Sequence, residues 1–224
     1  MRPQDRSNKT GSIFKFFGLL AFSLVFLFGC MGGKTLVVPL SYDTSRTVAM
    51  PFAQAKNMKI LLIPFKKGSG VSDDFGKWTG LTGKEDVIKS STPVDEAVTN
   101  AVYAYLKKAG FDVTLAPKGT TMDSSVTPAP DVVIGGTIQR ISTVAESSFG
   151  STTIKNDLAL QVSLKNEKDG SIVNENIEGS SEPKTIIALD DDAFKSGMDG
   201  VLSDSVEKIF TNIILKDGLL RPTT

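Results

Sequence analysis

The stretch TPVDEAVTNAVYAYLKKAGFDVTLA, residues 92–116, decides the fold. It predicts a helix that begins with Thr92 as N-cap and Pro93 at the first helical position, followed by carboxylates that suit the positive end of the helix dipole. Lysines and Gly110 close the helix, and the alternating residues 111–116 predict a strand directly after it. Apolar side chains recur every three or four positions along the helix and predict one buried stripe: Val94, Ala97, Val98, Ala101, Val102, Tyr105 and Leu106.

A short apolar run, Met58–Phe65, lies upstream of this helix and predicts a strand buried on both faces. Strand, helix and strand in this order predict two parallel, adjacent strands joined by a crossover helix. Between the first strand and the helix, residues 66–91 contain five glycines and the only tryptophan. We expect them to form a long loop, the kind of segment in which function often resides.

Downstream, residues 131–141 predict a strand in which Gly135 and Gly136 indicate a bulge or close packing. Residues 158–165 alternate between apolar and polar, Lys168-Asp169-Gly170 predicts a hairpin turn, and residues 171–179 predict a returning strand. Residues 118–130 are polar, and three prolines lie in or beside them: Pro117, Pro128 and Pro130. We therefore expect a surface connection. The three strands should form an antiparallel meander.

The last element is a long predicted helix that opens at Asp190-Asp191-Asp192, has an apolar face extending to Ile214 and stops at Gly218. Gly197 and Gly200 lower its helix propensity, and we expect them to allow close approach to a neighbouring element. Together these elements predict an α+β fold: a mixed sheet, made of a strand-helix-strand unit and a three-stranded antiparallel meander, with two helices packed on one face.

The N-terminal residues predict export. Basic residues precede the apolar block 16–28, which has the length of a secretory signal and is short for a membrane span. The block ends in Leu27-Phe28-Gly29-Cys30, which resembles the bacterial lipobox. That resemblance implies diacylglyceryl transfer to the Cys30 thiol, cleavage before Cys30 and N-acylation. Because residue 31 is Met rather than Asp, it also implies an outer-membrane address, facing the periplasm.

We therefore divide the chain into a signal peptide (1–29), a lipidated N-terminus and tether (30–57) and a single α+β domain (58–224). The tether contains glycines and two prolines, mixed with apolar pieces. Its residues 36–40 have an alternative placement along an edge of the domain, where Pro39 is tolerated.

Composition excludes several classes of chemistry. The chain has no histidine, and its one cysteine is assigned to acylation, which removes triad-type nucleophiles and the common zinc ligand sets. The 25 basic and 25 acidic residues balance, and residues 1–29 hold four of the basic and one of the acidic, so the remainder carries about −3. We expect no enzyme activity, no metal, no cofactor and no nucleic-acid partner, and attachment to the membrane through lipid alone.

Two aromatic residues in the expected loop, Phe75 and Trp78, are candidate contacts for a protein partner, although a core position for Trp78 is equally open. Paired carboxylates at Asp73-Asp74 and Glu85-Asp86 are the available residues for a hydrolase. No apolar surroundings are expected there to perturb a pKa, so solvated surface residues are the better interpretation.

The chain resembles small envelope lipoproteins of the YajG type. The resemblance extends over the lipobox, Ile63-Pro64-Phe65, the helix end 106–111, the run 131–138 and the last helix. The shared patterns are hydrophobic rather than chemical, and the long loop around Trp78 departs from them. The resemblance implies an outer-membrane lipoprotein, which is mostly a location. Our leading hypothesis for the function is a non-catalytic accessory component of the cell envelope that docks a protein partner. The alternative is a lipid- or glycan-binding module that uses the uncovered face of the sheet.

Overall fold

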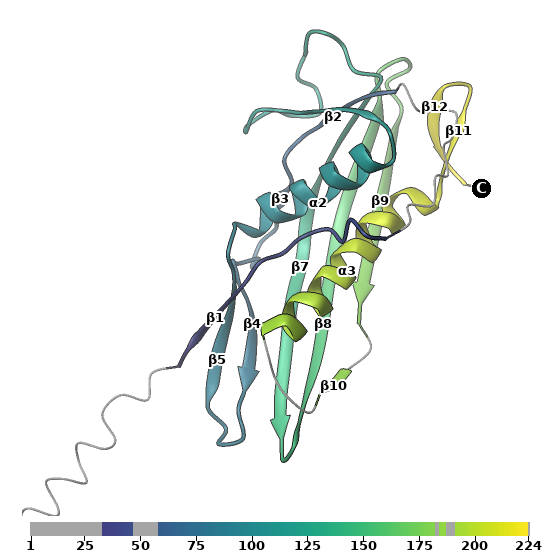
Figure 1. Ribbon diagram of the computed structural model, residues 1–224. Helices are drawn as coiled ribbons and strands as arrows, with labels where there is room; N and C mark the ends of the chain where they lie inside the picture. Colours follow the sequence, from purple (N-terminus) through teal and green to yellow (C-terminus); the bar gives the residue numbers. More distant parts are fainter. Residues whose placement is uncertain (1–32, 47–57, 182–183, 187–190, 224) are drawn as a thin grey trace, which may run out of the picture. The chain divides into compact units, whose positions relative to one another are not determined.

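The computed structural model describes residues 33–46, 58–181, 184–186 and 191–223. Residues 35–224 belong to one compact unit, in which the described part forms a ten-stranded mixed sheet with two helices on one face (Figure 1). The predicted α+β class is thus confirmed. Within the described ranges, neither helix combines the length and apolarity that a membrane crossing requires.

The strand-helix-strand unit is present as predicted. Strand β2 (Lys59–Leu62) pairs in parallel with β6 (Asp112–Leu115), and helix α2 (Val94–Lys108) connects them. Gly110 has a φ of 88° and ends the helix, as a glycine at this position is expected to do. The predicted cap is wrong by one residue, because Pro93 is the N-cap and offers no side-chain acceptor.

The meander is also confirmed, but its first two strands are much longer than predicted. Strand β7 (Val132–Ser148) pairs antiparallel with β8 (Ser151–Asn166), which pairs with β9 (Ile172–Ser180) and the short β10 (Lys184–Ile186). The other edge of β7 binds three strands in succession: β2, then β3 (Lys66–Lys67), then β4 (Asp74–Thr79). β7 is therefore the strand along which the sheet is assembled.

The expected loop 66–91 is wrong for most of its length. It contains β3 and a hairpin of β4 and β5 (Glu85–Ser90), in which the glycines of 80–84 make the turn. Gly76 lies within β4 because a Cβ there would meet the carbonyl of Thr143 at 2.5 Å. Glycine in this segment thus serves strand packing as well as turns.

The N-terminal segment takes the alternative placement, at the edge of the sheet. Strand β1 (Thr35–Val38) pairs in parallel with β5. Residues 40–46 then run along α3 (Asp191–Thr211), where Asp199 accepts hydrogen bonds from the backbone N–H and the hydroxyl of Ser41 at 2.7 and 3.0 Å. Much of the predicted tether is therefore part of the domain.

The last helix ends earlier than predicted. It stops at Thr211, and Ile213–Lys216 forms strand β11, which pairs with β12 (Leu219–Pro222). Asp217 and Gly218 both have positive φ, 56° and 76°, as a two-residue hairpin turn of type I′ requires. Gly218 is thus a turn residue rather than a helix stop.

The main core lies between the helices and one face of the sheet. Its aromatic centre is Tyr105, which packs edge-on against Tyr42 with ring centroids 5.9 Å apart and stacks on Phe210 at 5.2 Å. On the other face, the described residues form one small apolar cluster, covered by Met122 and Val126 from the connection after β6: Leu61, Ile63, Ala116 and Val133. These residues leave most of that face open.

Candidate functional site

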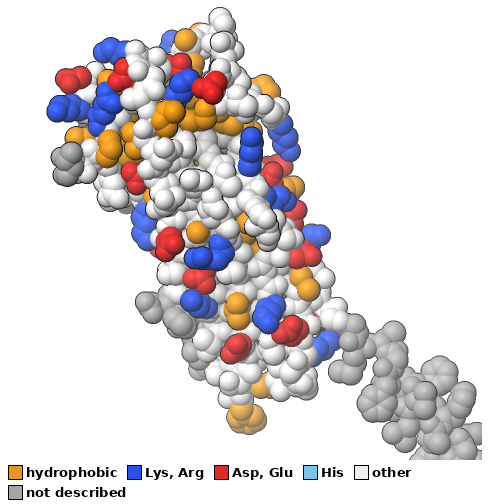
Figure 2. Space-filling view, turned by 180° about the vertical axis from the view of Figure 1, so that it is seen from behind, with side chains coloured by type: hydrophobic (Ala, Val, Ile, Leu, Met, Phe, Trp, Pro, Cys, Tyr) orange, Lys and Arg blue, Asp and Glu red, His pale blue; other side chains and the backbone are white. Residues whose placement is uncertain are grey.

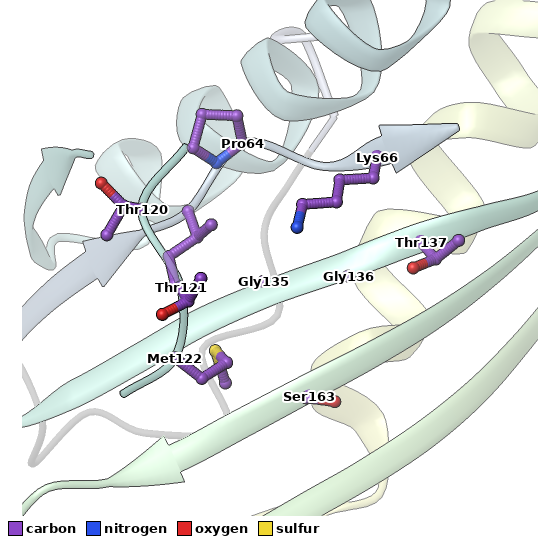
Figure 3. A pocket seen from close by; sticks show the side chains of 10 residues that line it. Pro64, Lys66, Thr120, Thr121, Met122, Gly135, Gly136, Thr137 and Ser163 are labelled. Carbon is purple, nitrogen blue, oxygen red and sulfur yellow. The ribbon is translucent and has the colours of Figure 1, made fainter. Parts of the chain in front are cut away.

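A cleft of about 270 Å³ lies on the open face, between the connection after β6 and the strands β7 and β8 (Figure 3). Pro64 and Lys66 come from the end of β2 and the start of β3, and Thr120, Thr121 and Met122 form the opposite wall. The floor comes from β7 and β8: Gly135, Gly136, Thr137 and Ser163. The polar connection predicted only as a surface segment therefore makes one wall of the cleft.

The glycines on the cleft floor are explained by packing. A Cβ on Gly136 would meet the carbonyl of Gln161 at 2.5 Å and the ring of Phe65 at 2.6 Å, and one on Gly135 would lie 3.2 Å from Ile63. This agrees with the predicted close packing, although the neighbours belong to β8 and to the segment between β2 and β3 rather than to a helix. The predicted bulge is elsewhere in β7, between Ile138 and Arg140.

The chemistry of the cleft is that of polar binding. Lys66 supplies a cation and the threonines supply hydroxyls, some of which are already used locally: Thr120 donates to the carbonyl of Pro117 at 2.8 Å, and Thr121 and Ser124 share a 3.1 Å hydrogen bond. Among the described residues that line the cleft, none is a carboxylate or a histidine that could act as a base for these hydroxyls. A small polar or anionic ligand could meet Lys66 and these hydroxyls in the cleft.

A second hollow of about 230 Å³ adjoins the first and shares Pro64, Lys66 and Thr120 with it. Lys67 and Asp95 line its far side, with Nζ and Oδ1 3.7 Å apart. Lys67 also donates a 2.9 Å hydrogen bond to Asp73. The hydrogen bond from Lys67 is the largest cause that lowers the pKa of Asp73, and the hydrogen bond from the Val94 N–H is the next. The hydrogen bond between Lys67 and Asp73 also raises the pKa of Lys67. Both groups stay charged at neutral pH, which suits a structural ion pair rather than proton transfer.

The four candidate carboxylates do not form a site. Asp73 is occupied by Lys67 and by α2, and Asp74 lies 3.9 Å from Lys89. Glu85 forms an ion pair with Lys77 at 3.0 Å at the far end of the same hairpin, where Asp86 pairs with Trp78 in the strand register. The residues are thus spread along the hairpin, and in the part of the chain that the structure describes no group of three His, Cys, Asp or Glu could hold a metal.

The two candidate contact aromatics lie in different surroundings. Phe75 is only 5 % exposed and belongs to the core under the helices. Trp78 is half-buried at the edge of that core, and its Nε1 donates a 2.8 Å hydrogen bond to Ser147. Phe75 therefore has a packing role. Contact with a protein partner stays a prediction, and Trp78 is the more accessible of the two candidates.

The open face of the sheet is polar. Gln139 and Gln161 hydrogen-bond across β7 and β8 at 3.1 Å, and Ser163 donates to Asn174 across β8 and β9 at 2.7 Å. Figure 2 shows this side of the molecule with scattered charges, and with hydrophobic side chains gathered mainly toward one end. These residues do not form the apolar or aromatic concave face that we expected for a lipid- or glycan-binding module. Cys30, the predicted lipidation site, lies outside the described residues.

Neither a protein-family model nor a curated protein matches the chain. Among solved structures, a DUF330 protein from Xanthomonas campestris matches with a TM-score of 0.47 and 9 % identity over 80 % of this chain and 91 % of that one. The PelC dodecamer from Paraburkholderia phytofirmans matches at 0.42 and 12 % over 71 % and 89 %, and lipoprotein GNA1162 from Neisseria meningitidis at 0.40 and 13 % over 69 % and 99 %. These likenesses concern the fold alone, and membership of the YajG type stays a prediction.

Proposed function

We propose that the chain is a bacterial envelope lipoprotein, anchored by acyl chains on Cys30 in the outer membrane and facing the periplasm, whose domain docks a protein partner without catalysing a reaction. The lipobox 27–30 supports the anchor. The absence of histidine and the dispersed carboxylates support the non-catalytic role.

The observation that carries the docking role is the open edge of β1. β1 pairs only with β5 among the described strands, so its other edge is free to accept an added strand. Sheet edges are commonly protected by charge, and another edge strand, β9, has Glu175 and Glu178. β1 has the sequence Thr-Leu-Val-Val, with no charge and with Val37 53 % exposed. An unprotected apolar edge on an exported protein fits a partner strand.

The test is a pull-down of the native protein extracted in detergent, with bound proteins identified by mass spectrometry. Val37→Lys should abolish capture of a stoichiometric partner, and Trp78→Ala should weaken it. Ile172→Lys is the matched control, because Ile172 is also 53 % exposed but lies on β9. Equal capture by the wild type and by Val37→Lys would disprove docking at this edge.

The anchor has its own test. Cys30→Ser should leave a precursor that is uncleaved and incorporates no labelled palmitate. A variant that matured and fractionated with membranes as the wild type does would disprove the lipidation.

The cleft beside Lys66 favours a second function, binding of a polar ligand such as a glycan, because a lysine and several hydroxyls line it beside the apolar side chains of Ile63, Pro64 and Met122. Small molecules that co-purify with the wild type but not with a Lys66→Ala, Thr121→Ala double variant would support it. If no such molecule co-purifies, the cleft is not the binding site.

A further inference from the structure

The two most exposed large hydrophobic side chains among the described residues lie at the tips of hairpins. Phe149, 99 % exposed, forms the turn between β7 and β8 together with Gly150, whose φ is 80°. Leu81, 67 % exposed, lies in the turn between β4 and β5. Single exposed hydrophobic residues are common on protein surfaces, so their position relative to the rest of the chain decides whether they matter.

Both tips lie at the end of the sheet where the chain enters it. Thr35, Val87, Lys77 and Val144 form one row across β1, β5, β4 and β7. Leu81 is four residues beyond this row along β4, and Phe149 is five residues beyond it along β7, which runs parallel to β4. At about 3.3 Å per residue the tips extend roughly 13 and 17 Å past Thr35. Figure 1 shows both turns at the end where β1 begins.

The length of chain before β1 matches this extension. Five residue steps lead from Cys30 to Thr35, and an extended chain covers at most about 3.6 Å per step, or roughly 18 Å. A membrane that holds acyl chains on Cys30 therefore lies within about 18 Å of Thr35, which is close to the distance that the tips extend past this residue.

The composition of the two turns suits a lipid surface. Residues 80–83 read Gly-Leu-Thr-Gly and residues 147–153 read Ser-Ser-Phe-Gly-Ser-Thr-Thr, so neither stretch contains a charged side chain. The nearest charge to Leu81 is Lys84, whose carbonyl accepts from the Gly80 N–H at 2.8 Å and whose long side chain can reach the headgroups. Hydroxyls and backbone groups can keep hydrogen bonds with lipid headgroups and water, while the apolar side chain enters the acyl boundary. A buried charge, the main obstacle to such insertion, is absent from these two stretches.

We propose that Phe149 and Leu81 insert into the leaflet that holds the Cys30 acyl chains, so that the lipid bilayer is the partner of this end of the sheet. The inference rests on the proposed lipid anchor. With the anchor and two hairpin tips in one bilayer, the strands point away from the membrane. The opposite end of β8 then lies about 50 Å farther out, since 15 residue steps separate Ser151 from Asn166.

The experiment uses the full chain, purified from membranes and placed in phosphatidylethanolamine and phosphatidylglycerol vesicles with or without brominated lipid, which quenches tryptophan fluorescence on contact. Trp78→Phe removes the native tryptophan, and a single tryptophan is then introduced as Phe149→Trp, Leu81→Trp or Ile172→Trp. Ile172 is the matched control, an exposed apolar residue of β9 that pairs with Lys165 at the far end of β8. The intact mass of each sample reports the acyl chains.

We expect brominated lipid to quench the tryptophans at 149 and 81, with emission shifted to shorter wavelength, and to leave that at 172 unchanged. In an acylated sample, absence of quenching at 149 and 81, or equal quenching at 172, overturns the inference while the anchor stands. If the mass shows no acyl chains, the proposed anchor fails. In that case, quenching of the tryptophans at 149 and 81 by added vesicles still supports membrane contact by the tips. Absence of this quenching overturns the proposed membrane contact.

Discussion

Asp73 accepts a 2.8 Å hydrogen bond from the backbone N–H of Val94 and thereby caps α2 from a segment 21 residues earlier in the chain. The N-cap residue itself, Pro93, has no side-chain acceptor, so the first turn of the helix depends on this distant carboxylate. The carboxylate also binds Lys67 at 2.9 Å, so it joins β3, the approach to β4 and α2.

Replacing Asp73 by alanine should lower the free energy of unfolding by about 1–2 kcal/mol, the usual cost of losing a capping acceptor. The partly exposed ion pair with Lys67 should add little, because water screens it. Asp74→Ala is the control, since Asp74 is exposed and lies 3.9 Å from Lys89, and it should change stability by less than about 0.5 kcal/mol. Urea unfolding measures both, and equal effects of the two changes would rule out the cap.

Stability should also depend on pH through Asp73. Its pKa is lowered in the folded state, first by the hydrogen bond from Lys67 and then by the Val94 N–H. A carboxylate with a lowered folded pKa contributes stability that is present above its unfolded pKa of about 3.9 and is lost as the pH falls through the folded pKa.

Asp73→Asn keeps an acceptor for Val94 and removes the titration. The stability difference between wild type and this variant should therefore be constant from about pH 7 to pH 5 and should shrink below about pH 4. Urea unfolding at a series of pH values measures it. A difference that stays the same at acidic pH would show that Asp73 has no lowered pKa.

The two glycines of α3 should respond in opposite directions to alanine. A Cβ on Gly200 meets nothing within 4 Å, so Gly200→Ala should raise stability by about 0.5–1 kcal/mol through helix propensity. A Cβ on Gly197 would lie 2.6 Å from Nδ2 of Asn156, a buried side chain held by a 2.7 Å hydrogen bond from Thr143. Gly197→Ala should therefore cost about 1–3 kcal/mol. Thermal unfolding compares them, and similar gains at both positions would contradict the packing of Gly197 against β8.

This pair shows where sequence reasoning succeeds and where it stops. Close approach was predicted for both glycines, and the structure has it only at Gly197, because the face of the helix that meets β8 depends on the arrangement of the whole sheet. Periodicity predicted α2 and the strands beside it, since a buried stripe leaves a repeating pattern. The cap from Asp73 could not be predicted, because it joins residues whose distance in space depends on tertiary structure.

Other differences had a signal in the sequence. Asp217-Gly218 lies between apolar residues, the usual sign of a two-residue hairpin, and the apolar face of the preceding helix concealed it. The β4–β5 hairpin alternates only weakly and contains three glycines, so it was interpreted as a loop. The cleft beside Lys66 could not be predicted from the sequence, because its two walls are far apart in the chain and part of its floor consists of glycines.

Asn166 attaches the C-terminal hairpin to the sheet, and its removal provides the last prediction. The side chain is 1 % exposed; its Nδ2 donates to the carbonyl of Leu220 at 3.0 Å and its Oδ1 accepts from the Leu220 N–H at 2.9 Å. Asn166→Ala leaves both buried backbone groups of Leu220 without this partner and should cost about 2–6 kcal/mol, at about 1–3 kcal/mol for each unsatisfied group. Asn174→Ala removes a hydrogen bond on the exposed face and should cost less than about 1 kcal/mol.

Hydrogen exchange distinguishes the local effect of Asn166→Ala from a general loss of stability. The amides of β11 and β12 should lose protection more than those of β7 and β8, because the hairpin detaches before the sheet unfolds. A uniform loss of protection across the domain would mean that Asn166 stabilises the end of β8 itself, where Nδ2 also donates to Ser171 at 2.9 Å. The hairpin would then owe its attachment to the apolar contacts of Ile213 and Leu220 with the core.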